Sequence, residues 1–142
     1  MTEVLFYTNA PDKLRTTCQL SCKALERKRR VMILTPEVQV TNRLSQLLWT
    51  TPSTGFTPHC RAADRLAGVT PVIIDHVTDP VIHEDVLINL CEDMPSFFSR
   101  FQRLIEIVTD DQSDRDRARE RYRYYRDRGY DIVTHDLGKT RS

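Results

Sequence analysis

Glycine is scarce in this chain, with four among its 142 residues. Phosphate-binding loops depend on glycine, because their backbone N–H groups must approach the phosphate closely. No GxGxxG motif occurs, and the GKT at residues 138–140 is no P-loop, since position 133 holds a valine where the first glycine should stand. The sequence therefore excludes the two common glycine-rich nucleotide-binding motifs.

An excess of charge of one sign is also missing, since 21 Lys and Arg residues face 20 Asp and Glu residues and the net charge is +1. Bulk attraction to nucleic acid needs a basic excess, so any such binding must come from a local patch. No apolar run approaches the roughly 20 residues that a membrane-spanning helix needs. The first residues lack the basic start and long apolar core of a signal peptide, so we expect a cytoplasmic protein.

No CxxC pair occurs, although the chain has four cysteines, at positions 18, 22, 60 and 91. Structural zinc sites usually show closely spaced ligand pairs. A zinc site built from Cys18, Cys22, Cys60 and His59 is the alternative that the sequence leaves open. The favoured interpretation is free, buried thiols in a reducing compartment, with no metal and no cofactor.

A catalytic constellation is absent as well, and no HExxH motif is found. His83 next to Glu84 and Asp85 could form a general base with an orienting acid, but a polar turn before the next strand is the favoured interpretation. Cys60 and His59 are adjacent, so on a strand they would point to opposite faces and could not act as nucleophile and base. We predict no enzymatic activity and no small-molecule substrate.

What is present is an alternation of short apolar runs and amphipathic segments. Strands are expected at residues 4–7, 31–34, 72–74, 86–90 and 104–108, although the last of these could instead continue the helix before it. Helices are expected from the cap Asp12 to the basic run at Arg27–Arg30, from Pro36 to Trp49, from Met94 to Phe101, and from Thr109 to Gly129. The alternation predicts an α/β fold, with one domain over residues 1–142, a mostly parallel sheet and helices on both faces.

Turn and cap residues define the expected boundaries. Thr35 is expected to cap the second helix, which Pro36 opens. Thr50–Ala63 is typical of a loop, and the chain after Thr134 is expected to be a linker. The basic run at Arg27–Arg30 fits the end of a helix, where cations complement the helix dipole.

The segment Arg117–Gly129 is the most unusual stretch, because it holds six arginines and three tyrosines. Aspartates dominate the start of the predicted helix and arginines its end, which suits the helix dipole. At 100° per residue, one arc of about 80° holds Arg115, Arg119, Arg123 and Arg126, with Tyr122 at its edge. Ala118 and Tyr125 fall where a core-facing stripe would lie. The remaining face, expected in open water, holds Arg117, Arg121, Tyr124 and Arg128.

Three interpretations of the arginine arc stay open. The first is a solvated amphipathic helix, which spacing alone favours. The second is a surface that grips a carboxylate with the guanidinium fork while an apolar group lodges beside the tyrosine ring. The third is a single-stranded nucleic-acid surface, since arginine and tyrosine also serve as stacking platforms.

Several motifs together resemble one family. The stretch ARERYRYYRDRGY at Ala118–Tyr130 resembles the C-terminal signature of the chi subunit of bacterial DNA polymerase III. Agreeing features elsewhere are Phe6-Tyr7, the basic turn before Val31–Leu34, Leu48-Trp49, FxPH at Phe56–His59 and DxLIxL at Asp85–Leu90. The resemblance implies a Rossmann-like fold without a P-loop and a non-catalytic clamp-loader accessory protein.

The resemblance also implies partners. The family binds the acidic C-terminal tail of single-stranded DNA-binding protein, which ends in a phenylalanine with a free carboxylate after several aspartates. The matching residues here are the basic contacts Arg115, Arg119 and Arg123 and the pocket walls Tyr122 and Val108. Single-stranded DNA would then be reached indirectly, through that protein. A stand-alone single-stranded nucleic-acid binder using the same helix is the alternative.

A second family surface binds the psi subunit or an accessory helicase. By the resemblance this surface is built around Phe56, with Trp49 and Pro58 nearby. Packing in the core is the alternative interpretation of Phe56 and Trp49.

Overall fold

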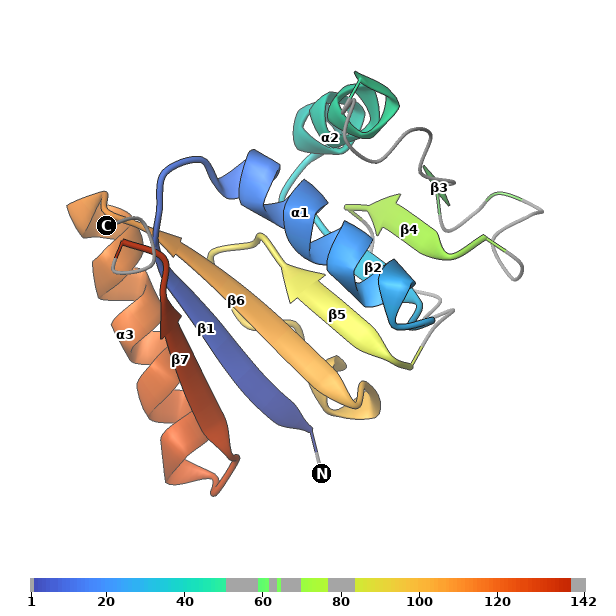
Figure 1. Ribbon diagram of the computed structural model, residues 1–142. Coiled ribbons are helices and arrows are strands. Elements are labelled where there is room, and N and C mark those ends of the chain that lie inside the picture. The colour runs from blue at the N-terminus through green and yellow to red at the C-terminus, as the bar shows by residue number, and fades with distance from the viewer. Residues whose placement is uncertain (1, 51–58, 62–63, 65–69, 77–83, 139–142) are drawn as a thin grey trace.

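One parallel sheet organises the protein, whose computed structural model describes residues 2–50, 59–61, 64, 70–76 and 84–138 (Figure 1). The sheet has seven strands in the order β3-β4-β2-β5-β6-β1-β7, and every neighbouring pair is parallel. The strands are β1 (Glu3–Ala10), β2 (Val31–Leu34), β3 (His59–Cys60), β4 (Val72–Asp75), β5 (Val86–Asn89), β6 (Arg103–Thr109) and β7 (Ile132–Asp136). The helices are α1 (Lys13–Glu26), α2 (Val38–Thr50) and α3 (Gln112–Asp127), with a 3-10 turn at Phe98–Arg100.

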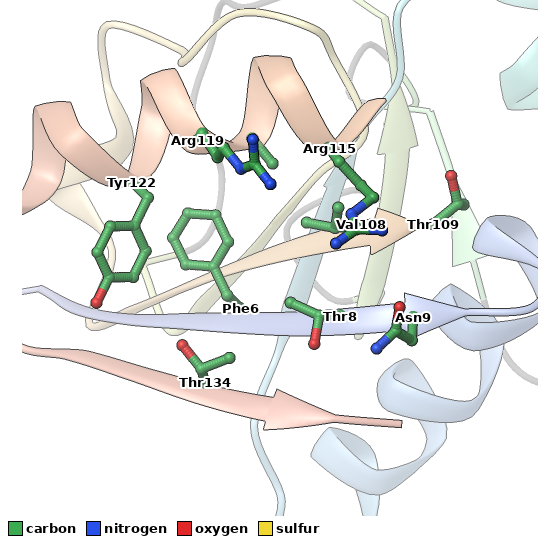
Figure 2. A pocket seen from close by; sticks show the side chains of 10 residues that line it. Phe6, Thr8, Asn9, Val108, Thr109, Arg115, Arg119, Tyr122 and Thr134 are labelled. Carbon is green, nitrogen blue, oxygen red and sulfur yellow. The ribbon is translucent and has the colours of Figure 1, made fainter. Parts of the chain in front are cut away.

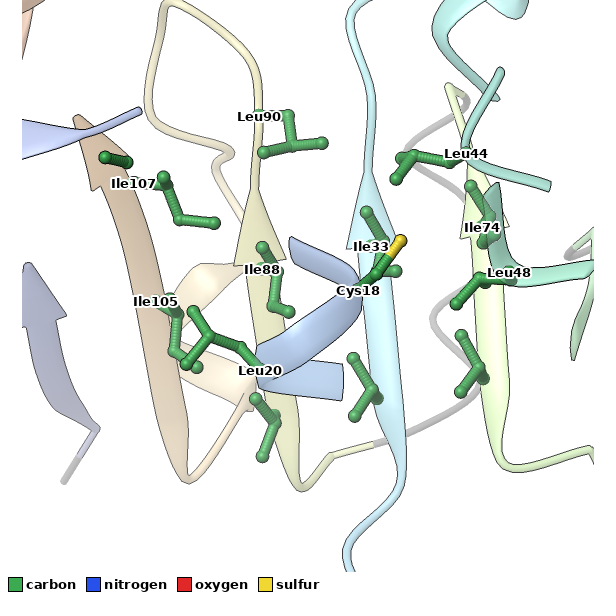
Figure 3. Packing of buried hydrophobic residues seen from close by; sticks show 14 of the residues in the cluster. Cys18, Leu20, Ile33, Leu44, Leu48, Ile74, Ile88, Leu90, Ile105 and Ile107 are labelled. Atoms are coloured by element: carbon green, nitrogen blue, oxygen red, sulfur yellow. The ribbon is translucent and has the colours of Figure 1, made fainter. Parts of the chain in front are cut away.

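Apolar side chains cover both faces of the strands β2, β4, β5 and β6. On one face α1 and α2 pack against a cluster that includes Ile33, Ile74 and Ile88 (Figure 3). On the other face α3 covers a cluster that includes Phe98 and Tyr125. Strands buried on both faces are typical of parallel sheets, which explains their continuous apolar runs. The predicted α/β fold with helices on both faces is confirmed, while one domain over residues 1–142 stays a prediction.

Helix α1 begins as expected but buries more polar residues than its apolar stripe indicates. The Asp12 carboxylate accepts hydrogen bonds from two N–H groups of the first turn, as a cap should. Cys18 is buried, and so are Thr17 and Ser21 beside it. The hydroxyls of Thr17 and Ser21 donate at 2.8 Å to the carbonyls of Lys13 and Thr17, one turn back. These bonds satisfy both hydroxyls within the helix, so the two side chains can face the sheet.

Helix α2 begins at Val38, two residues later than Pro36. Thr35 is therefore too far from the first turn to be its cap, and its N–H donates to the Asp75 carbonyl at 2.9 Å, which extends the strand ladder. The Thr35 hydroxyl lies 2.6 Å from the hydroxyl of Thr41 instead.

No helix in the described part of the chain is long and apolar enough to cross a bilayer.

The helix expected at residues 94–101 is wrong, since only the 3-10 turn at Phe98–Arg100 forms there. Phe97, Phe98 and Phe101 are all buried, two of them consecutively. The N–H groups of Phe98, Arg100 and Phe101 each donate to the carbonyl three residues back, which is the tighter 3-10 pattern and not that of an α-helix. The segment instead wedges its rings into the core beneath α3 and turns at once into β6, which confirms the strand interpretation of residues 104–108.

The end of α3 is a Schellman motif. The Tyr130 N–H donates to the Tyr125 carbonyl at 3.1 Å, and the Gly129 N–H donates to the Arg126 carbonyl at 3.0 Å. Gly129 has φ +80°, which confirms its expected role as the residue that ends the helix. The chain then reverses into β7, an edge strand that the sequence did not predict, and β3 lies in the expected loop.

Replacing Gly129 by alanine is expected to lower the free energy of unfolding by about 1–2 kcal/mol, because a Cβ disfavours this left-handed conformation. Apart from Gly129 and its two chain neighbours, no residue has a heavy atom within 4 Å of the Cβ position, so the loss comes from the backbone conformation and not from a clash. Thermal unfolding should show a midpoint lower by roughly 3–8 °C. Gly129→Asn is the control, because asparagine tolerates the left-handed region better, and equal midpoints for alanine and glycine would contradict the assignment.

Candidate functional site

A pocket of about 290 Å³ opens between α3 and the neighbouring strands (Figure 2). Its lining residues come from β1, the end of β6, α3 and β7, and they are Phe6, Thr8, Asn9, Val108, Thr109, Arg115, Ala118, Arg119, Tyr122 and Thr134. The pocket therefore combines apolar side chains, hydroxyls and two guanidinium groups from segments far apart in the sequence.

The apolar part of the pocket is an aromatic wall beside an aliphatic one. The Phe6 and Tyr122 rings lie 5.4 Å apart at an interplanar angle of 57°. Phe6 and Val108 are buried, whereas Tyr122 is 37% exposed. Ala118 faces the same space and, being small, leaves it open. A tilted ring pair next to a valine is a surface on which another apolar or aromatic side chain packs well.

The polar rim of the pocket carries positive charge. Arg115 and Arg119 lie one turn apart on α3, and Figure 2 shows Arg115 reaching over β6 while Arg119 stays close to the helix. Arg119 lies 3.7 Å from Asp116, with both side chains more than half exposed, so this pair is weak. No described acidic group lies within ion-pair distance of Arg115. Two guanidinium forks at an apolar well can hold a carboxylate whose own side chain is apolar.

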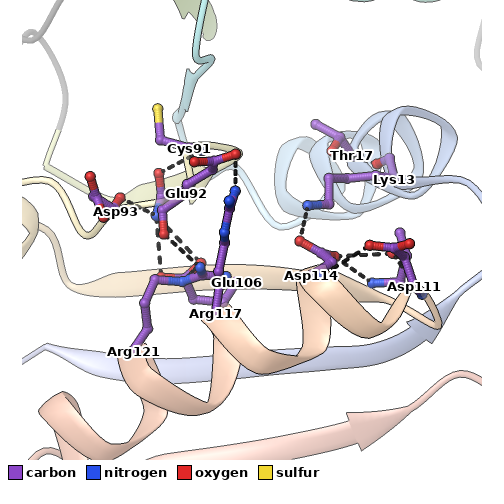
Figure 4. Close-up of polar contacts among 12 residues, drawn as sticks. Lys13, Thr17, Cys91, Glu92, Asp93, Glu106, Asp111, Asp114, Arg117 and Arg121 are labelled. Carbon is purple, nitrogen blue, oxygen red and sulfur yellow. Dashed lines mark hydrogen bonds and ion pairs between the residues drawn. The ribbon is translucent and has the colours of Figure 1, made fainter.

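Asp114 ties the first turn of α3 to β6 and α1 (Figure 4). Its carboxylate accepts the Thr109 N–H at 2.9 Å and the Thr109 hydroxyl at 3.1 Å, and pairs with Lys13 at 3.0 Å. Burial alone would raise the pKa of Asp114, but the bonds from Thr109 and Lys13 outweigh it, so this pKa lies below its ordinary value. The ionised carboxylate thus holds the neighbouring Arg115 at the rim of the pocket.

A buried ion pair defines the rotation of α3 about its own axis (Figure 4). Glu106 on β6 is fully buried, and its carboxylate accepts the Tyr125 hydroxyl at 2.7 Å and the Asn89 amide at 3.2 Å. The Arg121 Nε lies 3.1 Å from the other carboxylate oxygen, without the geometry of a hydrogen bond, while Nη1 donates to the Glu92 carbonyl at 2.7 Å. Complete burial raises the pKa of Glu106, and its partners oppose this.

This pair corrects the expected position of Arg121, which the helical arc placed in open water. Arg121 is only 6% exposed, because a carboxylate on a different element draws it inward. Tyr124 is half-buried rather than fully solvated, with the Arg128 guanidinium carbon 3.5 Å from its ring centroid. The expected core-facing positions of Ala118 and Tyr125 are confirmed.

A protein-family match covers nearly the whole chain. The family model described as "DNA polymerase III chi subunit, HolC" matches residues 1–133. The chain belongs to the DNA polymerase III chi subunit family. This confirms the resemblance drawn from the motifs, and it supports the expectation of a polymerase subunit rather than an enzyme in its own right.

Three curated relatives carry the same name, DNA polymerase III subunit chi. The protein from Pseudomonas aeruginosa is 30% identical over 141 residues, covering 96% of this chain and 98% of the relative. The protein from Escherichia coli is 29% identical over 118 residues, covering 82% and 80%. The protein from Haemophilus influenzae is 26% identical over 122 residues, covering 85% of each chain.

Four of the five tail-binding residues expected from the chi family line one pocket. These are Arg115, Arg119, Tyr122 and Val108. Arg123 is exposed on α3 but does not line the pocket. Their role in binding stays a prediction. The sequence reasoning did not assign six of the lining residues to this site, namely Phe6, Thr8, Asn9, Thr109, Ala118 and Thr134. Of these, Phe6 had a signal as part of the Phe6-Tyr7 motif, and Ala118 was expected to face the core.

The other expected chi-family surface lies mostly outside the described residues. Phe56 and Pro58 fall in the segment 51–58, which the structure does not describe. Trp49 belongs to α2, but its side chain is likewise not described.

Among the described residues, no three His, Cys, Asp or Glu side chains come together in a way that could hold a metal ion. Burial raises the pKa of the Cys18 thiol to about 11, as expected of an unreactive core cysteine. His59 contacts the Ser45 hydroxyl at 2.8 Å through Nε2. The side chain of Cys60, a member of the alternative zinc set, is outside the described residues.

Proposed function

We propose that this chi-family chain is an accessory subunit of the replication machinery that binds the acidic C-terminal tail of single-stranded DNA-binding protein and links it to the polymerase holoenzyme. The observation that carries the proposal is the pocket between α3 and the sheet, which joins an apolar well to Arg115 and Arg119. A tail that ends in phenylalanine with a free carboxylate offers the complementary groups.

The proposed contacts follow from that chemistry. The terminal ring packs between Val108 and the ring of Tyr122, while the terminal carboxylate accepts hydrogen bonds from Arg119 and Arg115. The aspartates before the end of the tail extend along α3 toward the exposed Arg123. Each contact is modest, but a strand coated with many copies of the tail-bearing protein raises the effective concentration and multiplies the affinity. The function is therefore tethering, and it needs no cofactor.

Removing one guanidinium tests this proposal directly. A fluorescent peptide ending in Asp-Asp-Ile-Pro-Phe is expected to bind the wild-type chain, and Arg119→Ala is expected to weaken binding by about 1.5–3 kcal/mol, the scale of a charge-assisted hydrogen bond. Fluorescence anisotropy measures both dissociation constants. Arg126→Ala is the matched control, because Arg126 is exposed on the same helix but does not line the pocket.

A second comparison separates this function from a stand-alone nucleic-acid binder that uses α3. A tail receptor should lose the peptide when its last residue is removed or its carboxylate is amidated. A nucleic-acid binder should instead ignore the peptide and show a salt dependence that counts phosphate contacts on α3. The proposal would be overturned if the wild-type protein did not bind the peptide but bound single-stranded DNA, and if Arg119→Ala abolished that DNA binding.

The remaining assignments depend on the same proposal. A replisome subunit works beside the chromosome, so we place the protein in the cytoplasm. A second partner, either the psi subunit or an accessory helicase, would bind near Phe56, Trp49 and Pro58, and this stays a prediction from the family.

A further inference from the structure

A second hollow lies on the opposite face of the same strands. It measures about 600 Å³ and runs between the last turns of α1 and the edge strand β7, over β6 and β1. In Figure 1, β1 and β7 face the viewer with no helix of the described chain in front of them, and α3 lies beside and behind β7. We call this hollow the α1-side groove, and six of its lining residues matter below: Tyr7, Lys23, Arg27, Arg29, Arg103 and His135.

The groove exists because neighbouring residues of a strand point to opposite faces of a sheet. We call the pocket between α3 and the strands the tail pocket. On β1, Phe6 lines the tail pocket and Tyr7 lines the groove. On β7, Thr134 lines the tail pocket, while Val133 and His135 line the groove. Val133 is 42% exposed, although strands of a parallel sheet are ordinarily covered on both sides. This uncovered apolar floor is therefore a surface that a ligand can cover.

The rim of the groove is strongly basic. Lys23 and Arg27 come from the end of α1, Arg29 from the turn that follows, and Arg103 from β6. Among the described residues that line the groove, Glu3 is the only acidic one, and it pairs with Arg103 at 3.1 Å. Cations at a helix end can simply complement its dipole, but Arg103 lies on a strand, so the dipole does not explain the whole cluster.

These charges converge on an aromatic floor. The Tyr7 and His135 rings stack, with centroids 4.9 Å apart and planes inclined by 23°. Burial raises the pKa of Tyr7 above its ordinary value, and the nearby positive charges of Arg103 and Arg27 oppose this rise. The groove thus places two stacked aromatic side chains among four basic side chains, in a chain whose net charge is only +1.

We propose that the α1-side groove binds single-stranded nucleic acid, with phosphates against Lys23, Arg27, Arg29 and Arg103 and bases against the Tyr7–His135 stack. Single strands combine regularly spaced negative charge with exposed flat rings, and a basic groove with an aromatic floor matches both. A duplex offers only phosphates, because its bases are already stacked. The site goes beyond the proposed function, since that function uses the other face of the strands and reaches DNA only through a second protein.

The test is binding of a fluorescent oligothymidylate of about 12 nucleotides, long enough to cover a site of this kind. Fluorescence anisotropy at several salt concentrations gives the affinity and its salt slope. A triple variant, Lys23→Gln, Arg27→Gln and Arg29→Gln, removes three rim charges but keeps the aliphatic stems. The matched control, Arg15→Gln, Arg43→Gln and Arg126→Gln, removes three exposed charges that line neither the groove nor the tail pocket.

For four phosphate contacts the wild-type slope should be about −3 on a log–log plot, at roughly 0.7 per contact, and the triple variant should fall to about −1. At about 50 mM salt the triple variant should bind at least about tenfold more weakly, while the control changes little. His135→Ala should lose about fivefold or more, the lower end of one base stacking contact. Neither change should alter affinity for the acidic peptide.

Three outcomes would overturn the proposal. The first is wild-type protein that does not bind the oligonucleotide at low salt, or that binds it no better than a duplex of equal length. The second is equal weakening in the triple variant and its control, which would indicate general electrostatics. The third is loss of the oligonucleotide on Arg119→Ala but not in the triple variant, which would move the site to α3. The peptide assay reports on the tail pocket separately, so the two proposals fail independently.

Discussion

Replacing Arg121 by alanine is expected to lower the free energy of unfolding by about 3–5 kcal/mol, because it leaves the Glu106 carboxylate buried without its counter-ion. Glu106 is fully buried, and Tyr125 and Asn89 alone would then have to stabilise its charge. Urea unfolding followed by circular dichroism measures the change. We expect the same variant to weaken binding of the acidic peptide, since α3 loses the contact that orients Arg115 and Arg119.

Two further variants separate the buried charge from the loss of an arginine in general. Arg117→Ala removes the ion pair between Arg117 and Glu92, whose side chains are 46% and 68% exposed. Its loss should lower the free energy of unfolding by less than about 1 kcal/mol. The double variant Arg121→Leu with Glu106→Leu removes both buried charges and should recover only part of the lost stability, because the buried Tyr125 hydroxyl loses its acceptor. Similar losses for Arg121→Ala and Arg117→Ala would show that the burial of this pair is not what stabilises α3.

Truncating Tyr122 to alanine is expected to weaken binding of the acidic peptide by about 2–4 kcal/mol, the range of an aromatic anchor in an interface. The ring forms one wall of the apolar well, 5.4 Å from Phe6. Because Tyr122 is 37% exposed, the free energy of unfolding should change much less than the binding energy. Peptide titration and urea unfolding of the same variant measure the two effects.

The matched control for this variant is Tyr122→Phe, which keeps the ring and removes only the hydroxyl. We expect it to bind the peptide within about 0.5–1.5 kcal/mol of wild type, since no more than one hydrogen bond is lost. Equal affinity for Tyr122→Ala and wild type would mean that the terminal ring does not pack in this well, even if Arg119→Ala weakens binding.

In the two proposals, the opposite faces of β1 and β7 serve as separate binding surfaces for one task. The tail pocket offers Arg115 and Arg119 beside an apolar well, and the α1-side groove offers cations over the Tyr7–His135 stack. A protein that holds a coating protein by one face and the coated strand by the other gains affinity from both contacts at once. The separate variants proposed for each face test this division of roles.

The sequence by itself determined most of the secondary structure and the composition of the arginine helix. Continuous apolar runs identified the strands β1, β2, β4, β5 and β6, and Gly129 identified the end of α3. These signals are local, because burial on both faces and a left-handed turn each restrict the residue types at single positions. The motif Ala118–Tyr130, together with FxPH at Phe56–His59 and the other matching motifs along the chain, was enough to identify the family.

Only the tertiary structure decided where the arginines of α3 point and what they face. Arg121 is buried because it pairs with Glu106 on β6. The angular positions of residues around a helix cannot predict a counter-ion on another element. The tail pocket needs Phe6 from β1 and Thr134 from β7, an edge strand whose residues Thr134 and His135 carry no strong apolar signal. Alternate residues of each strand point toward the two sites, and the adjacency of β1 to β7 and β6 brings residues of different strands together at each site. Such pairings join residues far apart in the chain, so the local periodicity of a sequence cannot contain them.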